Sequence, residues 1–206
     1  MDAYLSLYDQ PTYLLFGVCL FFLFIQLYYI LFVHGKLTFH SPKSTEFLRE
    51  QAQKNIIPVS IIVCVRNQEE LIRERLPIIL EQEYPQFEVV VVNDRSEDDT
   101  KWVLKELSAK HAHLKVVDIA EHILSQQGKK FGVAMGIKGA TYEHLLFTDI
   151  DCIPSTNHWL LHMSQGFQDQ KELTLGYVPF MRKGGLRNAM IRFRHFYDSI
   201  NYLSYA

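Results

Sequence analysis

The sequence predicts an α/β fold with a largely parallel sheet. Residues 59–65 (VSIIVCV) and 87–92 (FEVVVV) are rich in β-branched residues and nearly free of polar ones, which is typical of strands buried on both faces. Segments with the apolar spacing of helices follow each of these strands. Strands that alternate with helices usually pair in parallel, because each helix returns the chain to the same end of the sheet.

The first expected element is an apolar helix over residues 12–33, after a tail of residues 1–11. Its 22 residues carry no charge, and as a helix they would extend about 33 Å, the thickness of a bilayer core. A cleaved signal peptide fits less well, because no Lys or Arg precedes the run and the run is long. A buried soluble helix also fits less well, because apolar residues cover every face. We therefore expect a single N-terminal membrane span.

The charges on either side of this span predict its orientation. Acidic Asp2 and Asp9 precede it. Basic side chains follow it, at Lys36, Lys43, Arg49 and Lys54. The positive-inside bias then places the rest of the chain in the cytoplasm. Three widely separated cysteines without a CxxC pair agree with a reducing compartment.

A polar connector is expected over residues 34–57, before a domain of residues 58–206. The expected strands of this domain are residues 59–65, 87–92, 114–119, 144–148 and 173–180, and the expected helices are residues 69–83, 100–110, 131–140 and 157–167. Pro77 predicts a kink or break in the first helix. Three glycines weaken the prediction of the helix over residues 131–140.

Two further helical faces can be predicted from side-chain spacing. Trp102, Val103 and Leu107 are expected to form the inner face of the helix over residues 100–110. The basic and aromatic residues 186–206 predict an amphipathic helix, either on a membrane surface or with its apolar side packed against protein. The packed arrangement is favoured.

Polar residues follow the predicted strands. The sequences are RNQEE at 66–70, NDRSEDDT at 93–100, QGKK at 127–130, and the Asp149-Ile150-Asp151 triplet. Ligands of open parallel sheets bind at the carboxyl ends of the strands. Carboxylates there suit ribose or base hydrogens and a divalent cation, and lysines suit phosphate, so these residues indicate a nucleotide diphosphate.

Other sites are excluded by spacing and charge. The GxGxxG and GxxxxGK[ST] motifs are absent. A calcium loop beginning at Asp94 would need Gly where Asp99 stands and Glu where Lys105 stands. The formal net charge of −2 is not that of a protein that binds polyanions, so no nucleic-acid partner is expected.

Four segments in this order and spacing resemble the front half of a family 2 glycosyltransferase. They are PVSIIVCVRNQEELI, VVVVNDRSEDDT, GKK and LLFTDIDC, and the resemblance covers residues 58–180. It implies a GT-A fold, which is Rossmann-like, with a mostly parallel sheet and flanking helices. It also implies a nucleotide-diphosphate sugar as donor and a glycan or lipid-linked acceptor.

The resemblance implies roles for individual residues. Arg66, Asn67 and Glu69 match the nucleotide-contacting loop after the first strand. Asp94 matches the acid that holds the base, and Asp98 the second acid of the D-x-S-x-D pattern.

Lys129 and Lys130 match the Gly-Lys segment of the family, and Asp149 and Asp151 match its metal-binding DxD. Mg²⁺ or Mn²⁺ is the implied cofactor, and Asp149 also belongs to the implied nucleotide site. In an extended strand end, residues i and i+2 point the same way, so both carboxylates are expected to face one site.

The family usually inverts the anomeric centre with a carboxylate base from a later acidic motif. No such motif and no Gln-x-x-Arg-Trp segment follow Phe180, so we expect a partial sequence without its catalytic base. The alternative is a membrane-tethered, non-catalytic nucleotide-binding module.

Several other candidates have simpler interpretations. His158 and His162 have helical spacing but lack the neighbouring Glu of a zinc protease, so a solvated helix face is favoured. Cys152 has no nearby base to make it a nucleophile. Arg73 and Arg75 are expected to be solvated.

Overall fold

The computed structural model describes residues 10–35, 43–119, 128–168 and 171–205. The chain divides into two compact units. One comprises residues 43–176, and the other contains the described residues 10–35 and 177–205. Each unit is considered by itself.

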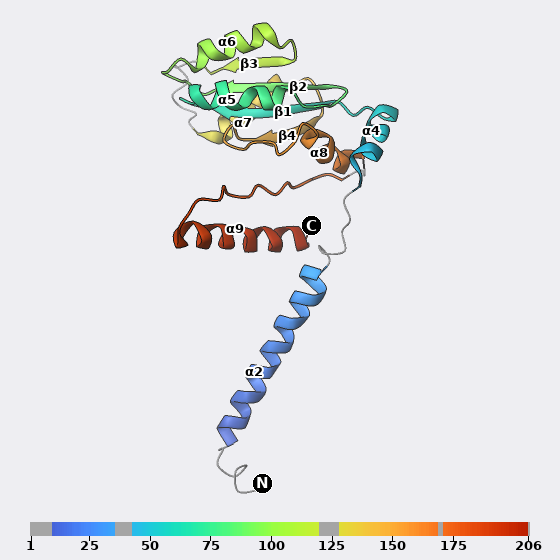
Figure 1. Cartoon of the computed structure of the whole chain (residues 1–206), viewed down its shortest axis with the longest axis vertical. Coiled ribbons are helices and arrows are strands. Elements are labelled where there is room, and N and C mark those ends of the chain that lie inside the picture. The colour runs from blue at the N-terminus through green and yellow to red at the C-terminus, as the bar shows by residue number, and fades with distance from the viewer. Residues whose placement is uncertain (1–9, 36–42, 120–127, 169–170, 206) are drawn as a thin grey trace. The chain divides into compact units, whose positions relative to one another are not determined.

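The unit of residues 43–176 is built on a parallel four-stranded sheet (Figure 1). Its strands are β1 (Val59–Val65), β2 (Phe87–Asn93), β3 (Leu114–Asp118) and β4 (His144–Thr148), in the order β3-β2-β1-β4. All three pairings are parallel, which confirms the predicted fold class. The inner strands β1 and β2 are almost completely buried, as their apolar runs predict, whereas the edge strands β3 and β4 are partly exposed.

Helices cover both faces of the sheet. They are α4 (Thr45–Lys54), α5 (Glu69–Leu80), α6 (Thr100–Lys110), α7 (Lys129–Gly139) and α8 (Trp159–Gln168). Residues from α4, α5, α6 and α8 share one hydrophobic cluster with alternate residues of β1 and β2, whereas α7 packs on the opposite face of the sheet. The fold is therefore a three-layer arrangement with the sheet in the middle.

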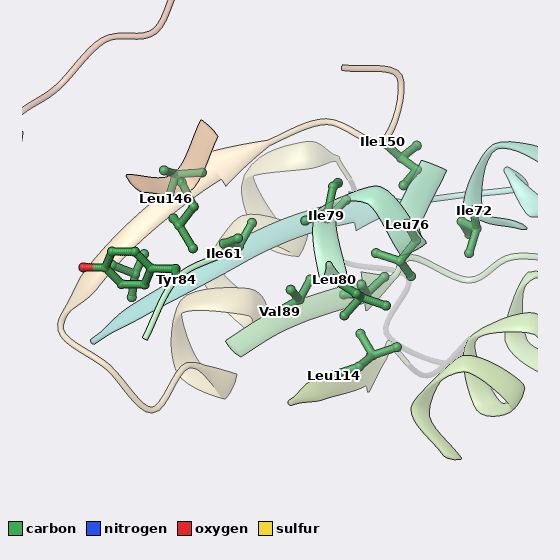
Figure 2. Close-up of a cluster of buried hydrophobic side chains, with 14 of the residues drawn as sticks. Ile61, Ile72, Leu76, Ile79, Leu80, Tyr84, Val89, Leu114, Leu146 and Ile150 are labelled. Carbon is green, nitrogen blue, oxygen red and sulfur yellow. The ribbon is translucent and has the colours of Figure 1, made fainter. Parts of the chain in front are cut away.

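Helix α5 lies over the sheet with one apolar stripe. Ile72, Leu76, Ile79 and Leu80 are buried, as their spacing predicts, and Figure 2 shows them among side chains of the strands. Pro77 does not break the helix: α5 continues past it to Leu80, and Ile79 and Leu80 beyond the proline are buried. Burial of this stripe offsets the hydrogen bond that proline removes.

The glycines of α7 face the sheet. A Cβ atom added at Gly136 would lie 2.5 Å from Ile62 Cγ2 and 3.1 Å from Val92 Cγ2. The helix therefore approaches β1 and β2 more closely than any larger residue at this position allows. Gly136, one of the three glycines that weakened the helix prediction, is therefore required for the packing of this helix.

The inner face of α6 differs from the predicted one. Trp102 is 65% exposed, with the Lys105 ammonium 5.5 Å from its ring centroid. Val103 and Leu104 are buried, and Leu107 packs against the same core. The buried positions follow i, i+3, i+4 and i+7 from Thr100, and Trp102 lies outside that stripe.

Two segments outside these strands also differ from expectation. The stretch expected to be a polar connector contains α4, whose Leu48 and Ala52 are buried in the core. The strand expected over residues 173–180 is absent from the described structure. There Leu173 is 75% exposed, and Gly176 and Pro179 interrupt the apolar run.

A buried carboxylate joins the amino ends of the strands. Glu88 of β2 accepts hydrogen bonds from Ser60 Oγ of β1 at 2.7 Å and from Thr141 N at 2.6 Å. The ammonium of Lys115 in β3 lies 2.8 Å from its other oxygen. Desolvation opposes ionisation, but the hydrogen bonds from Lys115, Thr141 and Ser60 outweigh it and lower the pKa of Glu88.

The second unit contains two long helical segments. Helix α2 (Gln10–Tyr28) continues into a π-helix, η1 (Tyr29–His34). Residues Thr12–His34 have a mean hydropathy of 2.4 and none of the most apolar stretch is buried, so this helix is long and apolar enough to cross a membrane.

Helix α9 (Leu186–Tyr205) forms where the amphipathic tail helix was predicted. Leu186, Met190, Phe193 and Tyr202 are between 64% and 78% exposed. Within the described residues these four side chains are not packed against protein, so the expected packing of this face stays a prediction.

Candidate functional site

A cavity of about 330 Å³ lies at the carboxyl ends of β1, β2 and β4. Its lining comprises Cys64, Val65, Arg66, Gln68, Asp94, Lys129, Gly132, Asp149, Ile150 and Asp151. The chain passes from β1 to β2 and β3 on one side and places β4 on the other, so the cavity adjoins the topological switch point of the sheet. The structure thus brings together Arg66, Asp94, Lys129 and the DxD pair.

The Asp149-Ile150-Asp151 segment is a reverse turn. The Cys152 N–H donates to the Asp149 carbonyl oxygen at 3.0 Å, and Ile150 is only 1% exposed within the core. The extended conformation expected for this segment is therefore wrong, because β4 ends at Thr148. The two carboxylates nevertheless line the same cavity.

Lys129 reaches Asp149 from the first residue of α7. Its Nζ lies 2.7 Å from Oδ1 and 2.8 Å from Oδ2 of Asp149. This hydrogen bond raises the pKa of the Lys129 ammonium. Gly128, with a φ of +111°, directs the chain into the helix at this point, a conformation that favours glycine.

The DxD residues suit a hard divalent cation. Asp149 pairs with the Lys129 ammonium in this structure, so a divalent cation would replace that ammonium at the carboxylate. No group of three or more His, Cys, Asp or Glu side chains that could hold a metal occurs in the described part of the chain. Two carboxylates are nonetheless sufficient for Mg²⁺ or Mn²⁺ when phosphate oxygens and waters complete the coordination.

Asp94 lines the cavity beside an arginine. The Arg95 guanidinium lies 2.6 Å from Asp94 Oδ1, and both side chains are at least 85% buried. The Asp94 N–H donates to the Val65 carbonyl at 2.9 Å, which links the ends of β1 and β2. The φ of Arg95 is +53°, so the chain turns sharply directly after the acid.

Three residues expected at the nucleotide site do not line the cavity: Asn67, Glu69 and Asp98. They join the loop after β1 to the loop after β2, and both of these loops contribute other residues to the cavity lining. Asn67 Oδ1 accepts from the Glu97 N–H at 2.8 Å, and Asp98 Oδ2 accepts from the Glu69 N–H at 3.2 Å. Asp98 also accepts from the Thr100 N–H at 3.1 Å, so one carboxylate satisfies donors at the starts of α5 and α6. We call these three hydrogen bonds the loop clasp.

Hydrogen bonding in the loop clasp favours the ionised form of the Asp98 carboxyl. Desolvation opposes ionisation, but hydrogen bonds from Thr100 and from the Glu69 N–H lower the pKa of Asp98. The ionised form is therefore the one that holds the two loops together.

Comparison with known proteins decides the family. The model of glycosyl transferase family 2 matches residues 60–203, which is more than half of the chain. The chain belongs to this family. Its parallel sheet with flanking helices is GT-A-like.

Individual relatives are longer than this chain. A poly-beta-1,6-N-acetyl-D-glucosamine synthase of Staphylococcus epidermidis is 27% identical over 144 residues, covering 68% of this chain and 33% of the relative. Glycosyltransferase AglE of Haloferax volcanii is 34% identical over 104 residues, covering 50% and 33%. The chain spans about a third of the length of these curated relatives.

Among solved structures, a mannosyltransferase from Pyrobaculum calidifontis in complex with GDP-Man and Mn²⁺ is 25% identical, with a TM-score of 0.48. That likeness covers 68% of this chain and 42% of the other.

Besides Asn67, Glu69 and Asp98, three further residues of this family 2 chain differ from the sequence analysis. Lys130 is exposed and does not line the cavity. Gln68 does line it, and its position directly after Asn67 in the first loop was an available signal. Arg75 donates to the Asp151 carbonyl at 2.9 Å and is 17% exposed, so its expected solvation is wrong. No local pattern in the sequence indicates this last contact.

Proposed function

We propose that this chain is the donor-binding part of a glycosyltransferase, which moves a sugar from a nucleotide-diphosphate sugar to an acceptor hydroxyl. The observation that carries the proposal is the cavity itself, where the DxD turn, Lys129 and Asp94 meet at the switch point of the sheet. This charge pattern suits a diphosphate with a divalent cation at one end and a nucleoside at the other. Membership of family 2 supports the same reaction class.

Each lining residue has a role in the proposal. Asp94 and Arg66 hold the nucleoside, and Lys129 neutralises phosphate when it exchanges Asp149 for the ligand. Asp149 and Asp151 hold Mg²⁺ or Mn²⁺. The bound cation supplies charge stabilisation for the leaving diphosphate.

The residues outside the cavity act on its shape. Asn67, Glu69 and Asp98 order the loops that carry Arg66 and Asp94. Lys130, next to Lys129 at the start of α7, adds positive charge near the phosphates.

The wider setting is also proposed from the sequence. In this proposal the apolar helix Thr12–His34 spans a membrane once, and the charges beside it support a cytoplasmic location for the unit of residues 43–176. The acceptor is a glycan or a lipid-linked hydroxyl, and the transfer inverts the anomeric centre. We assign none of the cavity carboxylates as the general base of that inversion.

Calorimetric titration of the full chain with UDP and GDP, with and without Mn²⁺, tests the shared binding step. We expect Mn²⁺ to tighten binding of one nucleotide, and Asp151→Ala to weaken the Mn²⁺-dependent part by about tenfold or more, or about 1.4 kcal/mol. Asp99→Ala is the control, because Asp99 does not line the cavity and makes no capping hydrogen bond.

The absence of any nucleotide diphosphate binding contradicts the proposal. Turnover of a nucleotide sugar by this chain excludes the alternative, the membrane-tethered, non-catalytic binding module.

A further inference from the structure

Arg75 is a largely buried cation next to the DxD turn. It lies on α5, its side chain is 17% exposed, and one guanidinium nitrogen donates to the Asp151 carbonyl oxygen at 2.9 Å. Its Nε is buried and makes no hydrogen bond within the described residues. The Glu74 carboxylate is 4.0 Å from that atom, beyond hydrogen-bond distance.

Its neighbour Arg73 has an ordinary surface environment. Arg73 is 52% exposed and pairs with Glu69 at 3.3 Å and with Glu106 at 3.4 Å. Removing a guanidinium from water is costly unless its hydrogen bonds repay the desolvation. The contact with Asp151 therefore has to account for the burial of Arg75, because no carboxylate within hydrogen-bond distance is described there.

The accepted carbonyl belongs to the metal-binding turn. Ile150 is anchored in the core, and the Cys152 N–H closes the turn on Asp149. These two contacts fix the start and middle of the turn. The bond from Arg75 fixes the peptide group that follows Asp151, and with it the backbone torsion that directs the Asp151 carboxylate.

We propose that Arg75 is a positioning residue that holds the Asp149-Ile150-Asp151 turn in the geometry that binds a divalent cation. The inference rests on the proposed function, because it assigns a purpose to the same turn. Arg75 does not line the cavity, so it acts on the cation through the backbone of Asp151.

The test is Mn²⁺ affinity in the full chain, measured by the EPR signal of free Mn²⁺ in the presence of UDP. Arg75→Met keeps the apolar stem and removes the donor, and we expect its Mn²⁺ dissociation constant to rise about tenfold. Arg75→Lys keeps the charge and one donor group, and we expect a smaller rise of about threefold. Arg73→Met, on the same helix, is expected to match the wild type.

A further readout, nucleotide affinity without metal, separates positioning from general stability. UDP affinity without metal is expected to be equal in wild type and Arg75→Met, because the lining residues are intact. Mn²⁺ affinity equal to wild type in Arg75→Met overturns the inference. If the methionine variant does not fold, Mn²⁺ affinity equal to wild type in Arg75→Lys overturns it. Wild-type protein that binds neither UDP nor GDP, with or without Mn²⁺, refutes the proposed function itself, which is a different outcome.

Discussion

Glu88 shows how one residue ties stability to pH. Its carboxylate is buried near the amino end of β2, away from the cavity, and accepts hydrogen bonds from β1 and from Thr141. Because its pKa is lowered in the folded state, the folded protein binds this proton less readily than the unfolded chain does. Its contribution to stability is therefore present above the unfolded pKa of 4.5 and is lost as the pH falls through the lower folded value.

We expect Glu88→Gln to destabilise the fold by about 1–3 kcal/mol at pH 7, since it removes a charged partner from a buried network. Urea unfolding between pH 7 and pH 3 measures the effect, and the variant should lose less stability on acidification than the wild type. Glu143→Gln, at an exposed position, serves as the control. Equal pH dependence in wild type and Glu88→Gln would show that other groups determine acid stability.

The contact of Arg75 with the DxD turn could not be predicted from the sequence, whereas other side chains near the cavity could. Asp94, Lys129, Asp149 and Asp151 could be predicted, because each directly follows a strand or starts the next helix. Arg75 lies nine residues after Arg66 in the chain and meets Asp151 only because α5 packs beside the end of β4. A contact of that kind depends on tertiary packing, which local spacing does not encode.

Among the elements, α7 is positioned by its glycine face. We expect Gly136→Ala to destabilise the protein by about 1–3 kcal/mol, because the added Cβ would lie 2.5 Å from Ile62 Cγ2 and overpack the interface with β1. Denaturant unfolding measures the change. Gly184→Ala is the matched control, because its Cβ meets no atom within 4 Å. A neutral Gly136→Ala would mean that α7 can move away from the sheet without loss.

The loop clasp couples two helix starts to the cavity. Asp98→Ala removes acceptors from the Glu69 and Thr100 N–H groups, so we expect a loss of about 1–2 kcal/mol in unfolding free energy without any ligand. Nucleotide binding should weaken as well, because the loops carrying Arg66 and Asp94 loosen. Asp99→Ala provides the comparison. If binding is lost while the unfolding free energy is unchanged, Asp98 instead contacts the nucleotide directly, as the family resemblance implies.

The strands β1 and β2 could be predicted to within one residue, because continuous β-branched runs have few alternatives. The segment of residues 173–180 is also largely apolar, but Gly176 and Pro179 interrupt it, and no described strand pairs with it. The predicted inner face of α6 included Trp102, whereas the buried stripe of that helix contains Leu104 instead. Composition indicates which residues prefer burial, but pairing and helix rotation decide which are buried.

For the whole molecule, the apolar helix is expected to determine where the protein resides. Deletion of residues 12–34 should move the chain from the membrane fraction to the soluble fraction after a carbonate wash, because the helix supplies the apolar length that a bilayer core requires. Immunoblotting of the two fractions measures the change. Wild-type protein that is washed off by carbonate would contradict a membrane span.

The order of the strands has a consequence for synthesis. β1 is made first but becomes an inner strand, and its Val59 pairs with Phe87 on one side and with His144 on the other. One hydrogen-bonding edge of this mostly apolar strand therefore stays open while the ribosome translates everything between β2 and β4. Such an edge is a template for pairing with another nascent chain. Slow translation of that interval should raise aggregation on the polysome, and the hazard ends once Thr148 has emerged.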